Sequence, residues 1–247
     1  MQALLWDVDG TLAETERDGH RRAFNRAFAD AGVPLHWDAE AYGLMLQVSG
    51  GRERIRAGLQ QLRGQLPQAS EVEALQVAKQ RHYAALVEAG DLQLRPGVAE
   101  LMAAAAAAGW RQAIVTTSGR SAVAALAQRC LGDLAEGLEL WVCGDDVARK
   151  KPDPEGYALA LQRLALPPGA ALAIEDSGHG LRAAHGAGLA CLITLSHYGS
   201  REPEGTFAAA TAVVDRLGPE GQVRRGPTCG ADGVTLAYLE RLLLLGA

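Results

Sequence analysis

Four groups of polar residues in this 247-residue sequence could together carry out the chemistry of phosphate esters. Each group directly follows a short apolar segment or lies in the loop after one. They are Asp7 to Thr11, Thr116 to Ser118, Lys150 to Pro152, and Glu175 with Asp176. Phosphoryl transfer needs a nucleophile, an acid or base, a cation site and donors to phosphate oxygens, and these groups contain all four.

The carboxylates Asp7 and Asp9 are the most specific signal. They follow the apolar run Ala3 to Trp6, so both should lie at one end of a buried strand. Two carboxylates at such a place repel each other, and Glu175 and Asp176 add negative charge, so a cation is expected there. Oxygen ligands beside a phosphate favour Mg²⁺. Turn or helix-capping carboxylates are the alternative, but Asp-x-Asp-Gly-Thr after an apolar strand is far more specific than a lone Asp-x-Asp.

Thr116 and Lys151 are the candidate phosphate ligands. Threonine often ends a strand, but the segment from Thr117 to Ser121 leads into a helix, and helix N-termini bind anions. Lys151 could be an ordinary solvated loop residue. However, only three of the 24 basic residues are lysines, so a lysine pair here suggests that a compact ammonium group is needed.

These groups require a sheet that brings strand ends together. Apolar runs near 3–6, 112–115, 138–142, 171–174 and 190–195 alternate with helical patterns, which predicts a parallel α/β sheet of the Rossmann-like type. Ligands bind at the carboxyl ends of the strands in such sheets. Residues 15–90 show helical patterns and no convincing strand, so we expect an all-helical cap inserted between core segments 1–14 and 91–247.

Two finer expectations concern the helices and the tail. Ala23, Phe24, Ala27, Phe28 and Ala31 are spaced to form one buried helical face, and further helices are expected near 50–63 and 70–89. Residues 199–230 are rich in Gly, Pro and charge, which predicts surface loops with one short strand near Val213, and a last helix is expected from about Val234 to Leu245.

Composition narrows the partners. The net charge of −5 and the absence of a basic stripe argue against nucleic acid. The longest apolar run, Leu101 to Ala108, is too short to span a membrane, and the first residues lack a secretory pattern. Four scattered cysteines show no zinc spacing and read as free thiols, with Cys130 and Cys191 buried. We expect a cytoplasmic protein that is a monomer or a weak homo-oligomer and acts on a small anionic molecule.

The four groups, in this order and spacing, resemble the motifs of the haloacid dehalogenase-like hydrolases. The resemblance implies that Asp7 attacks phosphorus and that Asp9 is the acid and base. It implies that Asp7, the backbone carbonyl of Asp9, Asp176 and Glu175 hold Mg²⁺. It also implies that Thr116 and Lys151 bind the transferring phosphoryl group.

The segments 13–24 and 49–55 are similar to the CbbY-type branch of that family, whose members dephosphorylate xylulose-1,5-bisphosphate. Arg52 stands where relatives often have lysine. From the resemblance and the local chemistry we expect a site for a sugar phosphate. One phosphate of a bisphosphate would lie at Asp7, and Arg52 would bind the other, distal phosphate when the cap closes. The candidate substrate-binding residues are Glu14, His20, Gly50, Gly51, Arg52, Thr117, Ser118 and Arg120.

Three other readings stay open at this point. A sugar phosphomutase of the β-phosphoglucomutase type would use the same nucleophile and return the phosphoryl group to the sugar. A phospho-acceptor receiver domain would combine an aspartate, a Ser/Thr and a lysine at strand ends, but it needs no helical cap. An inactive binding module is disfavoured because no motif is missing.

Overall fold

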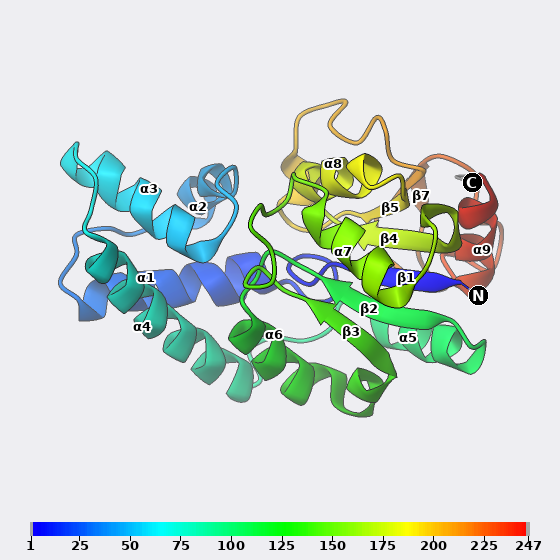
Figure 1. Cartoon of the computed structure of the whole chain (residues 1–247), viewed down its shortest axis with the longest axis horizontal. Helices are drawn as coiled ribbons and strands as arrows, with labels where there is room; N and C mark the ends of the chain where they lie inside the picture. The colour runs from blue at the N-terminus through cyan, green and yellow to red at the C-terminus, as the bar shows by residue number, and fades with distance from the viewer. Residues whose placement is uncertain (1, 246–247) are drawn as a thin grey trace.

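A computed structural model describes residues 2–245 and shows one seven-stranded sheet with helices on both faces (Figure 1). The strand order is β3-β2-β1-β4-β5-β6-β7, and every neighbouring pair is parallel except β6 with β7. The strands are β1 (Ala3–Trp6), β2 (Arg111–Val115), β3 (Leu138–Val142), β4 (Ala171–Glu175), β5 (Ala190–Thr194), β6 (Ala212–Val214) and β7 (Val223–Arg225). The predicted Rossmann-like α/β core is confirmed.

Two hydrophobic layers hold helices against the sheet. Side chains alternate along the central strand, so Leu4 and Trp6 face one layer while Ala3 and Leu5 face the other. All four are fully buried, as expected for a parallel sheet covered on both sides. The core helices are α5 (Val98–Ala107), α6 (Arg120–Leu126), α7 (Glu155–Leu164), α8 (Gly178–Gly186) and α9 (Leu236–Leu245). Helices α7 and α8 cover one face, and α5 and α9 cover the other.

A helical insert, residues Glu16–Glu88, extends from the core beyond the carboxyl end of β1 (Figure 1). It begins with a π-helical turn at Glu16–His20. Its helices are α1 (Arg21–Asp30), α2 (Ala39–Met45), α3 (Gly51–Arg63) and α4 (Ala69–Glu88). The insert has its own apolar cluster, in which Phe28 packs edge-on against Trp37 at 4.9 Å. The insert therefore has an apolar cluster of its own, while Tyr83, Leu86 and Val87 of α4 pack into the cluster on one face of the sheet.

The two connections of the insert to the core lie side by side. Ala13 and Leu94 form an antiparallel bridge, and the amide of Arg95 donates to the carbonyl of Leu12 at 2.8 Å. The entry and the exit of the insert are thus held together by backbone hydrogen bonds.

Some details differ from the sequence expectations. Ala31 is exposed because α1 already ends at Asp30, and Cys130 is only partly buried. The segment 199–230 contains, besides β6, the short strand β7, which pairs antiparallel with it. Helix α2 lies in a stretch for which no separate helix was predicted. No helix within residues 2–245 is long and apolar enough to cross a membrane.

Candidate active site

The site is built at the centre of the sheet, where Asp7 follows β1. The chain adds β2 and β3 on one side of β1 and β4 and β5 on the other, so the strand order reverses here. Open α/β sheets bind ligands at such a reversal. The amide of Asp7 donates to the carbonyl of Ile174 at 3.0 Å, which continues the ladder and sets Asp7 beside Glu175.

Lys151 joins the nucleophile candidate to the next strand. Its ammonium group donates to Asp7 Oδ1 at 2.7 Å, to Glu175 Oε1 at 2.6 Å and to the carbonyl of Val115 at 2.7 Å. Burial would lower the pKa of Lys151, but Asp7 and Glu175 outweigh it and raise that pKa well above its ordinary value. Lys151 therefore keeps its positive charge and holds it next to the Asp7 carboxylate.

Asp176 closes the site from the side of β4. Its Oδ2 accepts a hydrogen bond from Ser196 Oγ at 2.6 Å. The same oxygen approaches Gly10 so closely that a Cβ there would lie only 2.1 Å from it, and Gly10 has a φ of +88°. Only glycine fits this turn without strain. The Asp-x-Asp-Gly pattern thus brings Asp7, Asp9 and Asp176 to one place.

The carboxylates of Asp7, Glu175 and Asp176 fit a metal ion. Each offers an oxygen, and the three oxygens lie within 4.8 Å of one another. Burial, reinforced by Glu175 and Asp9 against the opposing effect of Lys151, raises the pKa of Asp7 to about 8. Burial and the charge of Asp7 likewise raise the pKa of Asp176. Among the described residues, Glu175 Oε2 has no hydrogen-bond partner. Three carboxylates thus share the single positive charge of Lys151, and a divalent cation would offset the remaining negative charge.

Asp9 is held by three side chains. Its Oδ1 accepts from Thr15 Oγ1 at 2.5 Å and contacts His20 Nε2 at 2.8 Å, and its Oδ2 accepts from Ser118 Oγ. Burial opposes ionisation of Asp9, but His20 and the hydroxyl donors outweigh it and lower the pKa of Asp9 well below its ordinary value. Asp9 is a carboxylate in this arrangement.

His20 is held in turn by the insert. Its Nδ1 lies 2.9 Å from Nζ of Lys79, and its ring stacks on Tyr83 with the centroids 4.2 Å apart. His20 ends the π-helical turn that opens the insert, and π-turns of this kind often occur at functional sites. His20 thus contacts Asp9, the candidate acid and base, but does not itself line the cavity.

A cavity of about 750 Å³ opens over Asp7 between the sheet, the insert and the loop after β5. This volume is within the usual range for small-molecule sites. Among the residues predicted for the site, those that line it are Asp7, Asp9, Glu14, Thr117, Lys151 and Asp176. Glu175, Thr116, Ser118 and His20 do not line it. Three of them support it from behind, since Ser118 and His20 bond Asp9 and Glu175 bonds Lys151.

The structure does not bring the other predicted substrate ligands to this cavity. Arg52 is half-exposed and pairs with Glu73 at 2.7 Å, and Arg120 pairs with Asp146 at the same distance. Gly50 and Gly51 begin α3 and are not in the cavity wall. In this arrangement the helix start at 50–52 faces Lys150 and Gln76.

Several lining residues were not predicted. Arg54 is buried and donates to Glu16 at 3.2 Å and to the Tyr42 hydroxyl at 2.8 Å. It lies in the same short motif as Arg52, but only the structure shows which arginine turns inward. Ser196 and His197 follow β5, so extending the strand-end rule to that strand would have found them.

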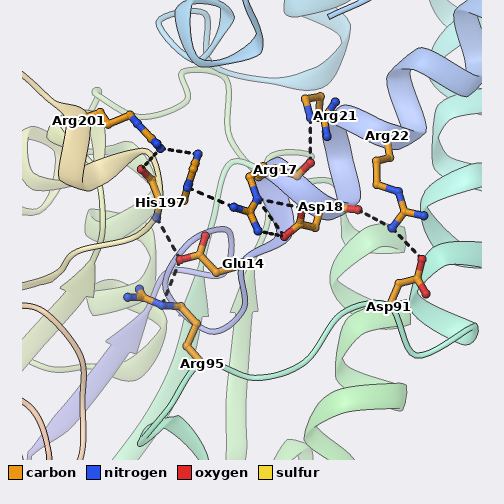
Figure 2. A network of polar contacts seen from close by, with 9 residues as sticks. All are labelled: Glu14, Arg17, Asp18, Arg21, Arg22, Asp91, Arg95, His197 and Arg201. Carbon is orange, nitrogen blue, oxygen red and sulfur yellow. Dashed lines mark hydrogen bonds and ion pairs between the residues drawn. The ribbon is translucent and has the colours of Figure 1, made fainter. Parts of the chain in front are cut away.

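Figure 2 shows the polar network where the insert meets the loop after β5. Arg17 Nη1 lies 3.4 Å from Nδ1 of His197, and the amide of His197 donates to Glu14 at 3.1 Å. Arg95, which is buried, lies 3.6 Å from Glu14 and donates to the carbonyls of Gly10, Thr194 and Leu195. Arg95 therefore anchors the turn at Gly10 to the end of β5.

Comparison with known proteins agrees with this site. Residues 1–188 match the family model described as haloacid dehalogenase-like hydrolase. The chain is 45% identical over 216 residues to protein CbbY of Cereibacter sphaeroides, covering 87% of this chain and 92% of the relative. It is 43% identical over 224 residues to the plasmid-borne protein CbbY of Cupriavidus necator, covering 88% and 86%.

The fold agrees as well. A crystal structure of mutant CbbY from Rhodobacter sphaeroides, in complex with xylulose-(1,5)bisphosphate, has a TM-score of 0.80 and 44% identity, covering 87% of this chain and 94% of that one. The family-model match, residues 1–188, includes the insert and all four groups of polar residues at the strand ends. The chain belongs to the haloacid dehalogenase-like hydrolases, and within them it groups with the CbbY proteins.

Proposed function

We propose that this phosphatase depends on Mg²⁺, passes through a phospho-aspartate on Asp7 and acts on a ketose bisphosphate such as xylulose-1,5-bisphosphate. The observation that supports it most is the Asp7–Lys151 contact at 2.7 Å, set among buried carboxylates at the floor of a substrate-sized cavity. The similarity to CbbY proteins over 87% of the chain supports the choice of substrate.

In the first step a carboxylate oxygen of Asp7 attacks phosphorus, and the ester P–O bond breaks. The leaving oxygen takes its proton from Asp9. Asp9 starts as a carboxylate, so it must take up a proton before this step, and His20 Nε2, 2.8 Å away, keeps the carboxyl group oriented. Lys151 offsets the charge that would otherwise keep a phosphate from Asp7.

In the second step water attacks the phosphorus of phospho-Asp7, and its proton passes to Asp9, which is then a base. The bond between phosphorus and the Asp7 oxygen breaks, phosphate leaves and the Asp7 carboxylate is restored. The hydrogen bonds from Thr15 and Ser118 keep Asp9 oriented in both steps.

The carboxylates of Asp7, Glu175 and Asp176, with the backbone carbonyl of Asp9, are the proposed ligands of Mg²⁺. When bound, this ion supplies charge neutralisation for the phosphoryl oxygens and the nucleophile. One oxygen of each carboxylate lies within 4.8 Å of the others, and Lys151 offsets part of their negative charge.

The direct test is phosphate release from a panel of phosphate esters with and without Mg²⁺. Xylulose-1,5-bisphosphate should give the highest kcat/KM, and chelation should stop turnover. Isomer formation without phosphate release would establish the mutase alternative instead. A stable phospho-protein that never turns over would contradict the enzymatic proposal altogether.

A further inference from the structure

The lysine next to Lys151 joins the core to the insert. Both lysines lie in the loop between β3 and α7, on the side of the core that faces the insert (Figure 1). Lys151 donates to Asp7, whereas Nζ of Lys150 donates to Glu53 Oε1 at 2.8 Å. Glu53 belongs to the first turn of α3, so this ion pair crosses from one part of the molecule to the other. Neither Lys150 nor Glu53 lines the cavity over Asp7.

The pair has no competing partners nearby. Within residues 2–245, Lys150 pairs with no other carboxylate and Glu53 with no other basic side chain. Burial would raise the pKa of Glu53, but the hydrogen bond and the charge of Lys150 outweigh it and lower that pKa. A neighbouring contact, Arg52 with Asp145 at 3.9 Å, crosses the same boundary. Both of its side chains are about half exposed, so water screens it more strongly.

Two glycines leave room for the Lys150 side chain. At Gly50, which precedes α3, a Cβ would lie 2.1 Å from Glu53 Oε2 and 2.7 Å from Nζ of Lys150. At Gly144, which follows β3, a Cβ would lie 2.2 Å from the Thr117 carbonyl and 3.3 Å from Cε of Lys150. The lysine therefore lies against bare backbone on both the core and the insert. Gly50, expected from the sequence to bind substrate, instead accommodates this ion pair.

The position of the insert determines one contact of the candidate acid and base. His20 belongs to the insert, and its Nε2 lies 2.8 Å from Asp9 Oδ1. The antiparallel bridge at the two connections fixes the insert to the core at one place. The lysine–glutamate pair fixes it at a second place, beside the loop that carries Lys151. Loss of this pair would favour arrangements in which the insert has moved away from the core.

From these contacts we infer that Lys150 is a positioning residue, whose ion pair with Glu53 holds the insert over the active site. In the arrangement described here, His20 is on Asp9 while Lys151 is on Asp7. The effect on the reaction rests on the roles proposed for Asp9 and Lys151. It does not depend on which sugar phosphate is the substrate.

The kinetic test compares Glu53→Gln, Lys150→Met and the double variant with wild type on 4-nitrophenyl phosphate. Each single variant should lose roughly three- to tenfold in kcat/KM at low salt. The double variant should lose no more than the larger single loss, because both substitutions remove the same contact. The difference from wild type should shrink in about 1 M salt, which screens the ion pair. Additive losses, or losses that salt leaves unchanged, would overturn the positioning role.

Arg149→Gln and Arg63→Gln are matched controls. Arg149 pairs with Asp153 inside the same core loop, and Arg63 pairs with Glu71 inside the insert. Each control removes a paired positive charge without breaking a contact between the two parts, so each should keep the kcat/KM of wild type. A loss in the controls equal to that in Lys150→Met would mean that the effect comes from net charge and would reject the inference.

Small-angle X-ray scattering without substrate separates this inference from the proposed function. A three- to tenfold loss of activity means that the arrangement described here is no longer the main one, so both single variants should have a larger radius of gyration than wild type. Their circular dichroism spectra should stay unchanged. An unchanged radius would reject the positioning role even if activity fell. A larger radius, together with full activity of Asp9→Asn, would support the positioning role and reject the role proposed for Asp9.

Discussion

The Nζ atom of Lys79 lies 2.9 Å from Nδ1 of His20, and both side chains are buried. The Lys79 ammonium lies over the rings of Phe24 and Tyr83, and the His20 ring stacks on Tyr83. Lys79 has no carboxylate in direct contact among the described residues, so its charge is poorly compensated. Burial lowers the pKa of Lys79 to about 8, although Glu16 and Asp9 oppose the shift. This pair connects the interior of the insert to Asp9.

The depressed pKa predicts a pH-dependent stability. Between about pH 8 and the ordinary lysine pKa, the unfolded chain keeps a proton that the folded chain has lost. Stability therefore rises with pH across this window and the contribution is lost as pH falls below it. Relative to Lys79→Met, wild type should gain roughly 2 kcal/mol in unfolding free energy between pH 7 and pH 10, measured by urea denaturation.

The control for that comparison is Val77→Met, an exposed change on the same helix with no titrating group. Its stability should follow that of wild type at every pH. A constant difference between wild type and Lys79→Met from pH 7 to pH 10 would mean that Lys79 titrates normally.

Asp7→Asn should abolish turnover while the protein stays folded. An amide is a poor nucleophile, and the substitution also removes one carboxylate from the cluster that fits a metal ion. Phosphate release should fall to background, with an unchanged circular dichroism spectrum. Retention of Mg²⁺-dependent activity well above background would exclude a phospho-Asp7 intermediate.

Asp9→Asn should reveal the acid role through the leaving group. Loss of general acid catalysis typically costs ~10²–10⁴-fold in rate. The phosphorylation step should lose much less with 4-nitrophenyl phosphate, because nitrophenolate leaves without a proton. Pre-steady-state release of nitrophenolate measures this step directly. If alkyl and nitrophenyl esters lose equally in that step, Asp9 does not protonate the leaving group.

Mg²⁺ should stabilise the folded protein by relieving repulsion among Asp7, Glu175 and Asp176. A ligand at a hundred times its Kd contributes about 2.7 kcal/mol, which corresponds to roughly 5–10 °C in Tm for a chain of this size. The Tm of Asp176→Asn should rise much less with Mg²⁺. The control is Asp215→Asn, because Asp215 is far from the cluster in sequence and bonds Arg224, and its Tm should rise as much as that of wild type. Equal Mg²⁺ shifts in all three proteins would place the ion elsewhere.

The position of the carboxylate cluster could be predicted from local sequence because its residues end a strand or directly follow one. Asp7, Glu175 and Asp176 continue β1 and β4, and parallel pairing places them side by side. The alternation of buried strands and helices is also local, so the fold class was predictable. What was not predictable were interactions of long side chains across the molecule.

Arg95 illustrates the limit. Its partners are the carbonyls of Gly10, Thr194 and Leu195, and backbone acceptors leave no pattern in the sequence. Which of Arg52 and Arg54 lines the cavity could not be predicted either. The two side chains leave the helix in different directions, and the sequence does not show which direction faces the cavity. Strand β7 was missed because it has only three residues and two of its side chains are exposed arginines.

The antiparallel bridge between Ala13 and Leu94 means that the chain leaves the core and returns to it at almost the same point. A segment attached in this way interrupts no strand and leaves the sheet register untouched. The core can therefore accept a change in the length or sequence of the insert at this point without a change in its own strand pairing.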